Sequence, residues 1–233
     1  MGPLLTTKLH VPRRRRGLVA RPRLSERLAG GGDAALTLVS APAGFGKTTL
    51  LTEWLTSADR RATAWLSLDA RDNDPSTFWT YLIAALQTAV PDLGTGAHAL
   101  LQEPHASLDE VLATLVNELD AAPDDLVVVL DDYHVVTLPN VHERMAFLVE
   151  HLPPHVHLVI ATRADPALPV ARWRARVGHH WGEGAITLLP PVPGVCGGGA
   201  PAWSQEVAPG ARGLRPPANR QAGEASAAIC WAR

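Results

Sequence analysis

The chain has 233 residues, enough for one α/β domain with a sizeable core, and its formal net charge is −2. Its two distant cysteines, Cys196 and Cys230, indicate neither a disulfide framework nor a zinc site, and no run approaches the roughly 18 apolar residues that a membrane span requires. We therefore expect a cytoplasmic protein with no membrane partner, and we exclude a disulfide-stapled secreted domain.

The charges are distributed unevenly along the chain. Residues 1–27 contain eight Lys or Arg and one Glu, whereas residues 28–176 contain nine basic and nineteen acidic residues. The run Arg13-Arg14-Arg15-Arg16 leaves nucleic-acid contact open, but a short basic run is more commonly a solvated segment, and no second basic patch accompanies it. The distribution predicts a basic N-terminal arm, residues 1–30, before an acidic body.

Apolar runs and amphipathic stretches alternate from residue 35 onwards. Asp74-Pro75 and Ser107-Leu-Asp-Glu110 are signals for helix N-termini, whereas residues 91–106 carry no such pattern and are predicted to form a loop. The alternation predicts βαβ units and a mostly parallel sheet within a three-layer α/β sandwich. The predicted strands are 35–40, 63–68, 126–130 and 156–161, and the predicted helices are 48–57, 75–90, 108–119 and 140–151.

The composition changes after Arg176. Residues 177–233 contain ten Gly, seven Pro and eleven Ala in 57 positions, and they show no sustained periodicity of 3.6 or 2.0 residues. A segment of this kind lacks the patterned apolar surface from which a core is built. We predict a folded domain over residues 31–176 and a low-complexity, disordered tail over 177–233, in which only 185–189 resembles a strand.

The segment Ala41-Pro-Ala-Gly-Phe-Gly-Lys-Thr48 joins a predicted strand to a predicted helix, as a phosphate-binding loop does. In such loops, backbone N–H groups at a helix N-terminus surround the phosphates, because these donors are unsatisfied and the helix dipole favours anions. Lys47 is expected to reach the β- and γ-phosphates, and the Thr48 hydroxyl to coordinate Mg²⁺. Ala41 occupies the position of the first glycine in the usual pattern. The residues expected to line ATP or ADP are Ala43, Gly44, Phe45, Gly46, Lys47, Thr48 and Thr49.

Polar residues follow two further predicted strands. Asp131 and Asp132 come directly after the run 126–130, and Arg163 follows the strand 156–161. Because ligands of α/β proteins bind at the carboxyl edge of a parallel sheet, Asp131 is expected to hold Mg²⁺ and Asp132 to orient or activate a water molecule. Arginine stabilises charge on a phosphoryl group, but surface arginines at strand ends are common, so both interpretations of Arg163 stay open.

Other residues with chemical potential have simpler interpretations. The histidines His151, His155 and His157 lie close together in the sequence, but no acidic or cysteine partner has metal-ligand spacing, which favours a surface or core-edge role. Tryptophans occupy apolar positions of predicted elements, which is typical of core residues. These tryptophans are Trp54, Trp65 and Trp79.

Five segments of the chain occur together and in a fixed order. They are Leu4-Leu-Thr-Thr-Lys-Leu9, Leu18-Val-Ala-Arg-Pro-Arg-Leu24, Ser40-Ala-Pro-Ala-Gly-Phe-Gly-Lys-Thr-Thr49, Leu130-Asp-Asp-Tyr-His134 and Ile160-Ala-Thr-Arg-Ala-Asp-Pro166. Together they resemble one bacterial family, the large ATP-binding LuxR-type transcriptional activators of the maltose-regulator type. The chain is similar to their N-terminal nucleotide-binding domain over about residues 3–176, and Ala41 is usual in that family's phosphate loop.

The resemblance implies a P-loop NTPase fold of the AAA+/STAND type that binds ATP or ADP with Mg²⁺. It implies that Asp131 and Asp132 are the acidic pair, that Arg163 senses the γ-phosphate, and that Arg21 lies in a segment against the base or sugar. In the family, ATP and an inducer drive self-association and ADP holds the resting state, so weak hydrolysis resets a switch.

Family members continue into a helical region, a winged helix, inducer-sensing helical repeats and a C-terminal helix-turn-helix. Residues 177–233 carry no such pattern, so we expect a truncated regulatory domain that does not bind a promoter directly, with a frameshift as one hypothesis for the tail. Three alternatives stay open: a stand-alone phosphoryl-transfer enzyme, a module that binds ATP without turnover, and a non-functional fragment.

Overall fold

The structure is a computed structural model that describes residues 3–13, 21–30, 34–57, 61–177 and 186–189. The chain divides into two compact units, 1–197 and 198–233, and every described residue lies in the first. The predicted disorder of the tail therefore falls outside the described residues, apart from the strand noted below. No helix of the described ranges is long and apolar enough to cross a membrane.

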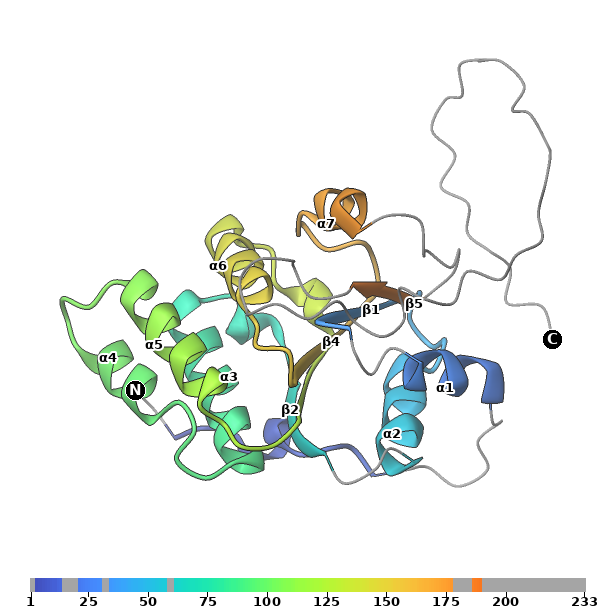
Figure 1. Ribbon diagram of the computed structural model, residues 1–233, viewed down its shortest axis with the longest axis horizontal. Helices are drawn as coiled ribbons and strands as arrows, with labels where there is room; N and C mark the ends of the chain where they lie inside the picture. The colour runs from blue at the N-terminus through green and yellow to red at the C-terminus, as the bar shows by residue number, and fades with distance from the viewer. Residues whose placement is uncertain (1–2, 14–20, 31–33, 58–60, 178–185, 190–233) are drawn as a thin grey trace, which may run out of the picture. The chain divides into compact units, whose positions relative to one another are not determined.

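A five-stranded sheet forms the centre of the first unit, in the order β2-β3-β4-β1-β5 (Figure 1). Four strands are parallel, as the sequence predicts, and β5 pairs antiparallel with β1 at one edge. β5 covers four residues of the predicted strand 185–189. The bounds are β1 Leu36–Ser40, β2 Ala62–Ser67, β3 Leu126–Asp131, β4 Val156–Thr162 and β5 Ile186–Leu189.

The central strands are buried on both faces, and alternate residues supply two separate cores. On β1, Leu36 and Leu38 join the larger core, whereas Val39 joins the smaller core. On β4, Leu158 and Val159 divide in the same way. Consecutive apolar residues are therefore needed on these strands, which explains the continuous apolar runs in the sequence.

Helices cover both faces and complete the predicted three-layer α/β sandwich (Figure 1). The smaller core receives side chains from α1 and α2, and the larger core receives them from α3, α4, α5 and α6. The helices are α1 Pro22–Ala29, α2 Lys47–Ser57, α3 Pro75–Ala89, α4 Thr95–Gln102, α5 Leu108–Asp120, α6 Pro139–Glu150 and α7 Val170–Val177. The 3₁₀ turns are η1 Thr6–Leu9, η2 Ala70–Asp72 and η3 Tyr133–Val135.

Local signals placed several elements correctly. The Asp74 carboxylate accepts a hydrogen bond of 2.9 Å from the backbone N–H of Thr77, and Ser107 and Glu110 form the predicted capping box. The predicted core tryptophans are all buried, with 3%, 1% and 0% of their surfaces exposed for Trp54, Trp65 and Trp79. N-caps and apolar periodicity depend on residues that are close together in the sequence, so they can be recognised without knowing the fold.

The prediction of a loop over residues 91–106 is wrong, because these residues contain α4. Gly94 precedes this helix with a φ of +78°, a conformation that glycine adopts readily. The Glu118 carboxylate, on α5, then accepts hydrogen bonds from the backbone N–H groups of Gly96 at 2.8 Å and Ala97 at 3.4 Å. The helix is therefore capped by a residue that is distant in the sequence, which no local pattern reveals.

The N-terminal segment is attached to the edge of the sheet. η1 packs beside β2, and the buried Lys8 ammonium donates a hydrogen bond to the fully buried carboxylate of Asp72. Its Nζ also lies 3.3 Å from Asp69 and 4.2 Å from the ring centroid of Tyr81. These contacts cover an edge strand and hold the start of the chain near the end of β2.

Candidate functional site

The predicted phosphate-binding loop runs from the end of β1 to the start of α2. Its first residue, Ala41, donates its N–H to the carbonyl of Thr162 at the end of β4, at 3.2 Å. Gly44 and Gly46 have φ values of +80° and +77°, which side-chain-bearing residues adopt at a cost. Ala41 has no positive φ, so the alanine that departs from the usual pattern carries no such cost.

Lys47 lies inside this loop and is only 8% exposed. Its ammonium donates to the backbone carbonyls of Ala41 at 2.8 Å and Pro42 at 3.4 Å. Burial lowers the pKa of Lys47, and the nearby carboxylates of Asp132 and Asp131 partly offset this effect. The lysine is thus a largely desolvated cation that is bonded to carbonyl oxygens of its own loop and lies near two acids.

The predicted magnesium residues are in direct contact although they are 83 positions apart. The Thr48 hydroxyl donates a hydrogen bond of 2.7 Å to one Asp131 carboxylate oxygen, and the other oxygen accepts from the N–H of Asp132 at 3.0 Å. Asp131 is 3% exposed, and burial raises its pKa, whereas the Thr48 hydrogen bond opposes the rise.

This pair of oxygen ligands fits Mg²⁺. Magnesium is usually held by one or two protein oxygens while phosphates and water fill its remaining positions, so a dedicated cage is unnecessary. The described residues contain no cluster of three or more His, Cys, Asp or Glu that could hold a metal ion by themselves.

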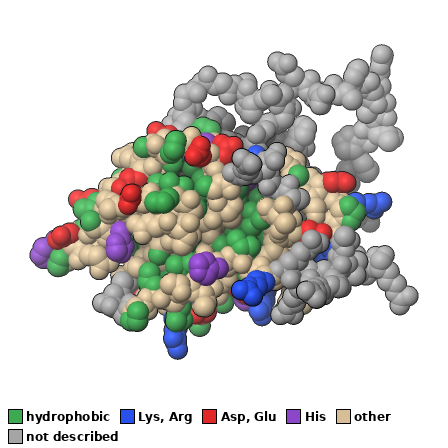
Figure 2. All heavy atoms as spheres, turned by 90° about the horizontal axis from the view of Figure 1, so that it is seen from below, with side chains coloured by type: hydrophobic (Ala, Val, Ile, Leu, Met, Phe, Trp, Pro, Cys, Tyr) green, Lys and Arg blue, Asp and Glu red, His purple; other side chains and the backbone are tan. Residues whose placement is uncertain are grey.

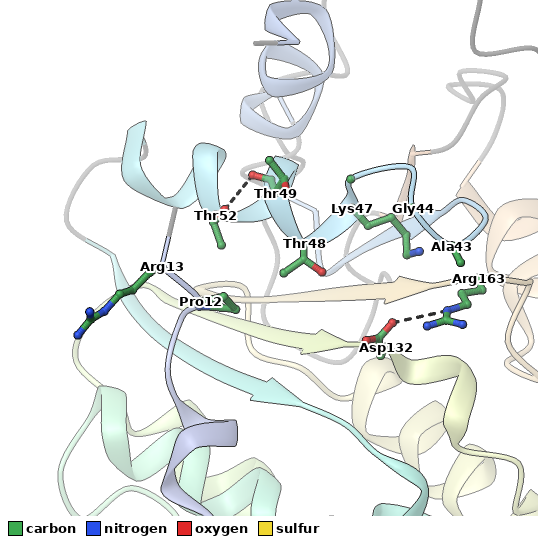
Figure 3. A pocket seen from close by; sticks show the side chains of 11 residues that line it. Pro12, Arg13, Ala43, Gly44, Lys47, Thr48, Thr49, Thr52, Asp132 and Arg163 are labelled. Atoms are coloured by element: carbon green, nitrogen blue, oxygen red, sulfur yellow. Dashed lines mark hydrogen bonds and ion pairs between the residues drawn. The ribbon is translucent and has the colours of Figure 1, made fainter. Parts of the chain in front are cut away.

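Asp132 and Arg163 lie together across the site from Lys47 (Figure 3). The Arg163 Nε is 3.9 Å from the Asp132 carboxylate, and the His134 Nδ1 is 3.7 Å from the same oxygen, Oδ1. The backbone of Asp132 is left-handed, with a φ of +58°, an uncommon conformation that costs about 1 kcal/mol or more and is concentrated at functional sites.

A cavity of about 430 Å³ joins these parts into one site. This volume lies within the range of small-molecule and cofactor pockets. Most of the predicted residues line it, and Pro12, Arg13 and Thr52 line it although the sequence did not indicate them. The lining residues are Pro12, Arg13, Ala43, Gly44, Gly46, Lys47, Thr48, Thr49, Thr52, Asp132 and Arg163.

Three predicted residues do not line the cavity. The Arg21 guanidinium, at the start of α1, donates a hydrogen bond of 2.9 Å to the carbonyl of Phe45 in the phosphate loop, so Arg21 and Phe45 connect these two segments. Asp131 reaches the site through its hydrogen bond with Thr48, which does line the cavity. Thr52 follows Thr48 by four residues on α2, and this helical spacing was the available signal for it. Pro12 had no signal, and Arg13 stood out only as part of a basic run. The packing of η1 beside β2 brings both residues to the site.

A family model described as "AAA ATPase domain" matches residues 21–161, which is more than half of the chain. The chain therefore belongs to the AAA ATPase domain family, as its parallel sheet and phosphate loop indicate.

Within this class, the curated relatives confirm the resemblance to maltose-type regulators. The HTH-type transcriptional regulator MalT of Cronobacter sakazakii is 41% identical over 179 residues, and that of Yersinia enterocolitica is 40% identical over 174 residues. Each match covers 74% of this chain and 19% of the relative, so the chain spans about a fifth of their length. A chain of a solved structure, "Structure of Drosophila ORC bound to DNA", is 16% identical with a TM-score of 0.45, over 66% of this chain and 41% of that chain.

Proposed function

We propose that this domain binds ATP and ADP with Mg²⁺ and acts as the nucleotide-dependent switch of a MalT-like transcription regulator. The observation that carries the proposal is the 2.7 Å hydrogen bond between Thr48 and Asp131 beside the buried Lys47. It joins a phosphate loop to an acidic strand end at the sheet edge where nucleotides bind in α/β proteins. The MalT relatives, which are HTH-type transcriptional regulators, support the regulatory part.

Each residue has a distinct part in nucleotide binding. Lys47 exchanges its bonds to the carbonyls of Ala41 and Pro42 for the β- and γ-phosphate oxygens. Backbone N–H groups from residue 43 to residue 49 surround the phosphates at the start of α2. Thr48 and Asp131 would hold Mg²⁺, Asp131 partly through water, and the ion would supply positive charge beside the β- and γ-phosphates.

Turnover depends on residues at the opposite wall of the cavity. Asp132 orients a water molecule toward the γ-phosphate, and Arg163 stabilises the charge that develops on it. Arg163 is 49% exposed on its side chain, so it is free of tight packing and can turn from Asp132 to the phosphate. Slow hydrolysis then converts the ATP state to the ADP state, and self-association follows the ATP state.

Direct promoter contact is not part of the proposal. On the one face that Figure 2 draws, the Lys and Arg side chains of the described residues lie at separate places, among acidic and histidine side chains.

Calorimetric titration of the purified chain with ATP and ADP, with and without Mg²⁺, tests the binding. Lys47→Ala is expected to weaken ATP binding by at least about tenfold to a hundredfold, since hydrogen bonds to charged groups contribute roughly 1.5–3 kcal/mol. Arg144→Ala is the control. Arg144, on α6, pairs with Asp109, on α5, at 3.1 Å, and neither residue lines the cavity. Binding by Lys47→Ala that equals the parent's would overturn the assignment.

Two further measurements test the switch. Light scattering should report a larger mass with ATP than with ADP. ATP turnover should be slow and unaffected by added phosphate acceptors, because a switch needs only water as the acceptor. Turnover that requires an acceptor would instead identify a stand-alone phosphoryl-transfer enzyme.

A further inference from the structure

His134 is a polar residue beside the site to which the proposed function gives no role. It lies in η3, two residues after Asp132, and its side chain is 22% exposed. Its Nδ1 atom is buried and has no hydrogen-bond partner in the part of the chain that the structure describes. A buried ring nitrogen is costly without a partner, and the nearest charged oxygen is the Asp132 Oδ1 at 3.7 Å.

The same carboxylate oxygen is shared by a second group. Arg163 Nε lies 3.9 Å from Asp132 Oδ1. The Asp132 side chain is 41% exposed, so packing alone does not hold its carboxylate in one direction. If Arg163 turns to a γ-phosphate, as the proposed function requires, His134 is the neighbour that stays to hold Asp132.

The charge state of His134 suits this task. Burial lowers the pKa of His134, Arg163 and Lys47 add to this effect, and Asp132 opposes it. The ring is therefore neutral near pH 7.5 and carries one N–H. When the proton is on Nδ1, this N–H is directed at the Asp132 carboxylate. The distance between His134 Nδ1 and Asp132 Oδ1 can then shorten when nucleotide is bound.

The turn itself is anchored by other residues. Tyr133 is fully buried, and its hydroxyl lies 3.1 Å from the Nδ1 of His142 on α6. The Tyr133 and His142 rings also pack edge to face, with centroids 5.5 Å apart. Because η3 is held by Tyr133 in the larger core, the His134 ring is not needed to keep the turn in place.

We propose that His134 is a positioning residue, whose Nδ1–H holds the Asp132 carboxylate in the direction needed to orient the attacking water. The proposal rests on the proposed function, because it assigns the water-orienting role to Asp132. It adds a residue that touches neither nucleotide nor Mg²⁺ and acts through Asp132 alone.

Substitutions at His134 separate a donor from a space-filling ring. His134→Leu removes the donor at similar bulk, and His134→Asn restores an N–H donor near the Nδ1 position. We expect His134→Leu to slow ATP hydrolysis about tenfold while ATP affinity changes less than twofold, and His134→Asn to recover most of the rate. Asp132→Asn should slow hydrolysis as well, and the double variant should be no slower than Asp132→Asn, since both changes break one interaction.

Nuclear magnetic resonance of the ¹⁵N-labelled imidazole rings tests the contact in the ligand-free full chain. The parent should show His134 protonated on Nδ1 at pH 7.5, and Asp132→Asn should alter this signal. Protonation on Nε2 in the parent, a parental hydrolysis rate in His134→Leu, or additive losses in the double variant would each overturn the proposal. If the parent binds no ATP, the proposed function fails, whereas the tautomer measurement still decides whether His134 holds Asp132.

Discussion

A buried histidine should make the core of this domain sensitive to acid. His157, on β4, is 3% exposed, and its Nε2 lies 2.8 Å from the hydroxyl of the buried Thr37 on β1. Its Nδ1 is buried without a hydrogen-bond partner among the described residues, and its ring packs edge-on against Trp54 at 5.9 Å. Burial, aided by the charge of Arg61, lowers the pKa of His157 from 6.5 to about 4.

The direction of the effect follows from the two protonation states. Above about pH 6.5, His157 is neutral in both the folded and the unfolded chain, so its contribution to stability is fully present. As the pH falls from 6.5 toward about 4, the unfolded chain binds a proton that the folded chain does not, and this contribution is lost. At about 1.4 kcal/mol per pH unit, the loss is roughly 3 kcal/mol.

Urea unfolding at pH 7.5 and pH 4.5 measures this loss. The double variant Thr37→Val/His157→Phe removes the titrating group together with its partner, so no buried hydroxyl is left unsatisfied, and the new ring still packs against Trp54. Between the two pH values, the parent should lose about 2.5 kcal/mol more unfolding free energy than the double variant.

The comparison with the double variant is essential because other groups also titrate in this range. His105→Ala, at an exposed position, is the control and should lose as much stability as the parent does. An equal loss in the parent and the double variant would refute the reasoning, since it would show that His157 binds its proton as readily in the folded chain as in the unfolded chain.

Two further predictions concern buried charges. Asp131→Asn should raise the thermal midpoint of the ligand-free domain at pH 7.5, because burial raises the Asp131 pKa and the ionised form is therefore unfavourable in the folded state. This gain in thermal midpoint should vanish as the pH falls below the pKa that Asp131 has in the unfolded chain. Calorimetry should also show weaker Mg²⁺-dependent ATP binding by Asp131→Asn. A lower midpoint than the parent's at pH 7.5 would contradict the stability prediction. Lys8→Met should lower the unfolding free energy by about 3–5 kcal/mol in urea, because it leaves the fully buried Asp72 carboxylate without its cation, and Lys8→Met/Asp72→Asn should recover part of the loss. A single-variant loss below about 1 kcal/mol would show that the pair behaves as a surface ion pair.

The conformation of the loop and its place between a strand and a helix were predictable because they are encoded in consecutive residues. Gly44 and Gly46 satisfy two left-handed backbone positions, and the loop lies between a buried strand and a helix. Asp131 and Asp132 were identified by their place directly after an apolar run. In each case the signal depends on neighbouring residues, so no knowledge of the fold was needed.

Other parts were not predictable because they depend on distant contacts. The helix α4 depends on Glu118, which caps it from α5, and Pro12 reaches the cavity only because Lys8 attaches the N-terminal segment beside β2. The role proposed for His134 likewise needed its distance to Asp132 and the burial of its Nδ1, which a sequence does not contain.

The sequence by itself thus determined a phosphate loop, an acidic strand end and the alternation of strands and helices, because backbone conformation and burial follow local patterns. Only the tertiary structure decided which side chains meet. Thr48 contacts Asp131 because β1 and β3 both run parallel to β4, which lies between them and brings their carboxyl ends to one edge. Arg163 reaches Asp132 for the same reason, since β4 ends beside β3. Strand order and register are global properties of the folded sheet, and they turn separate motifs into one site.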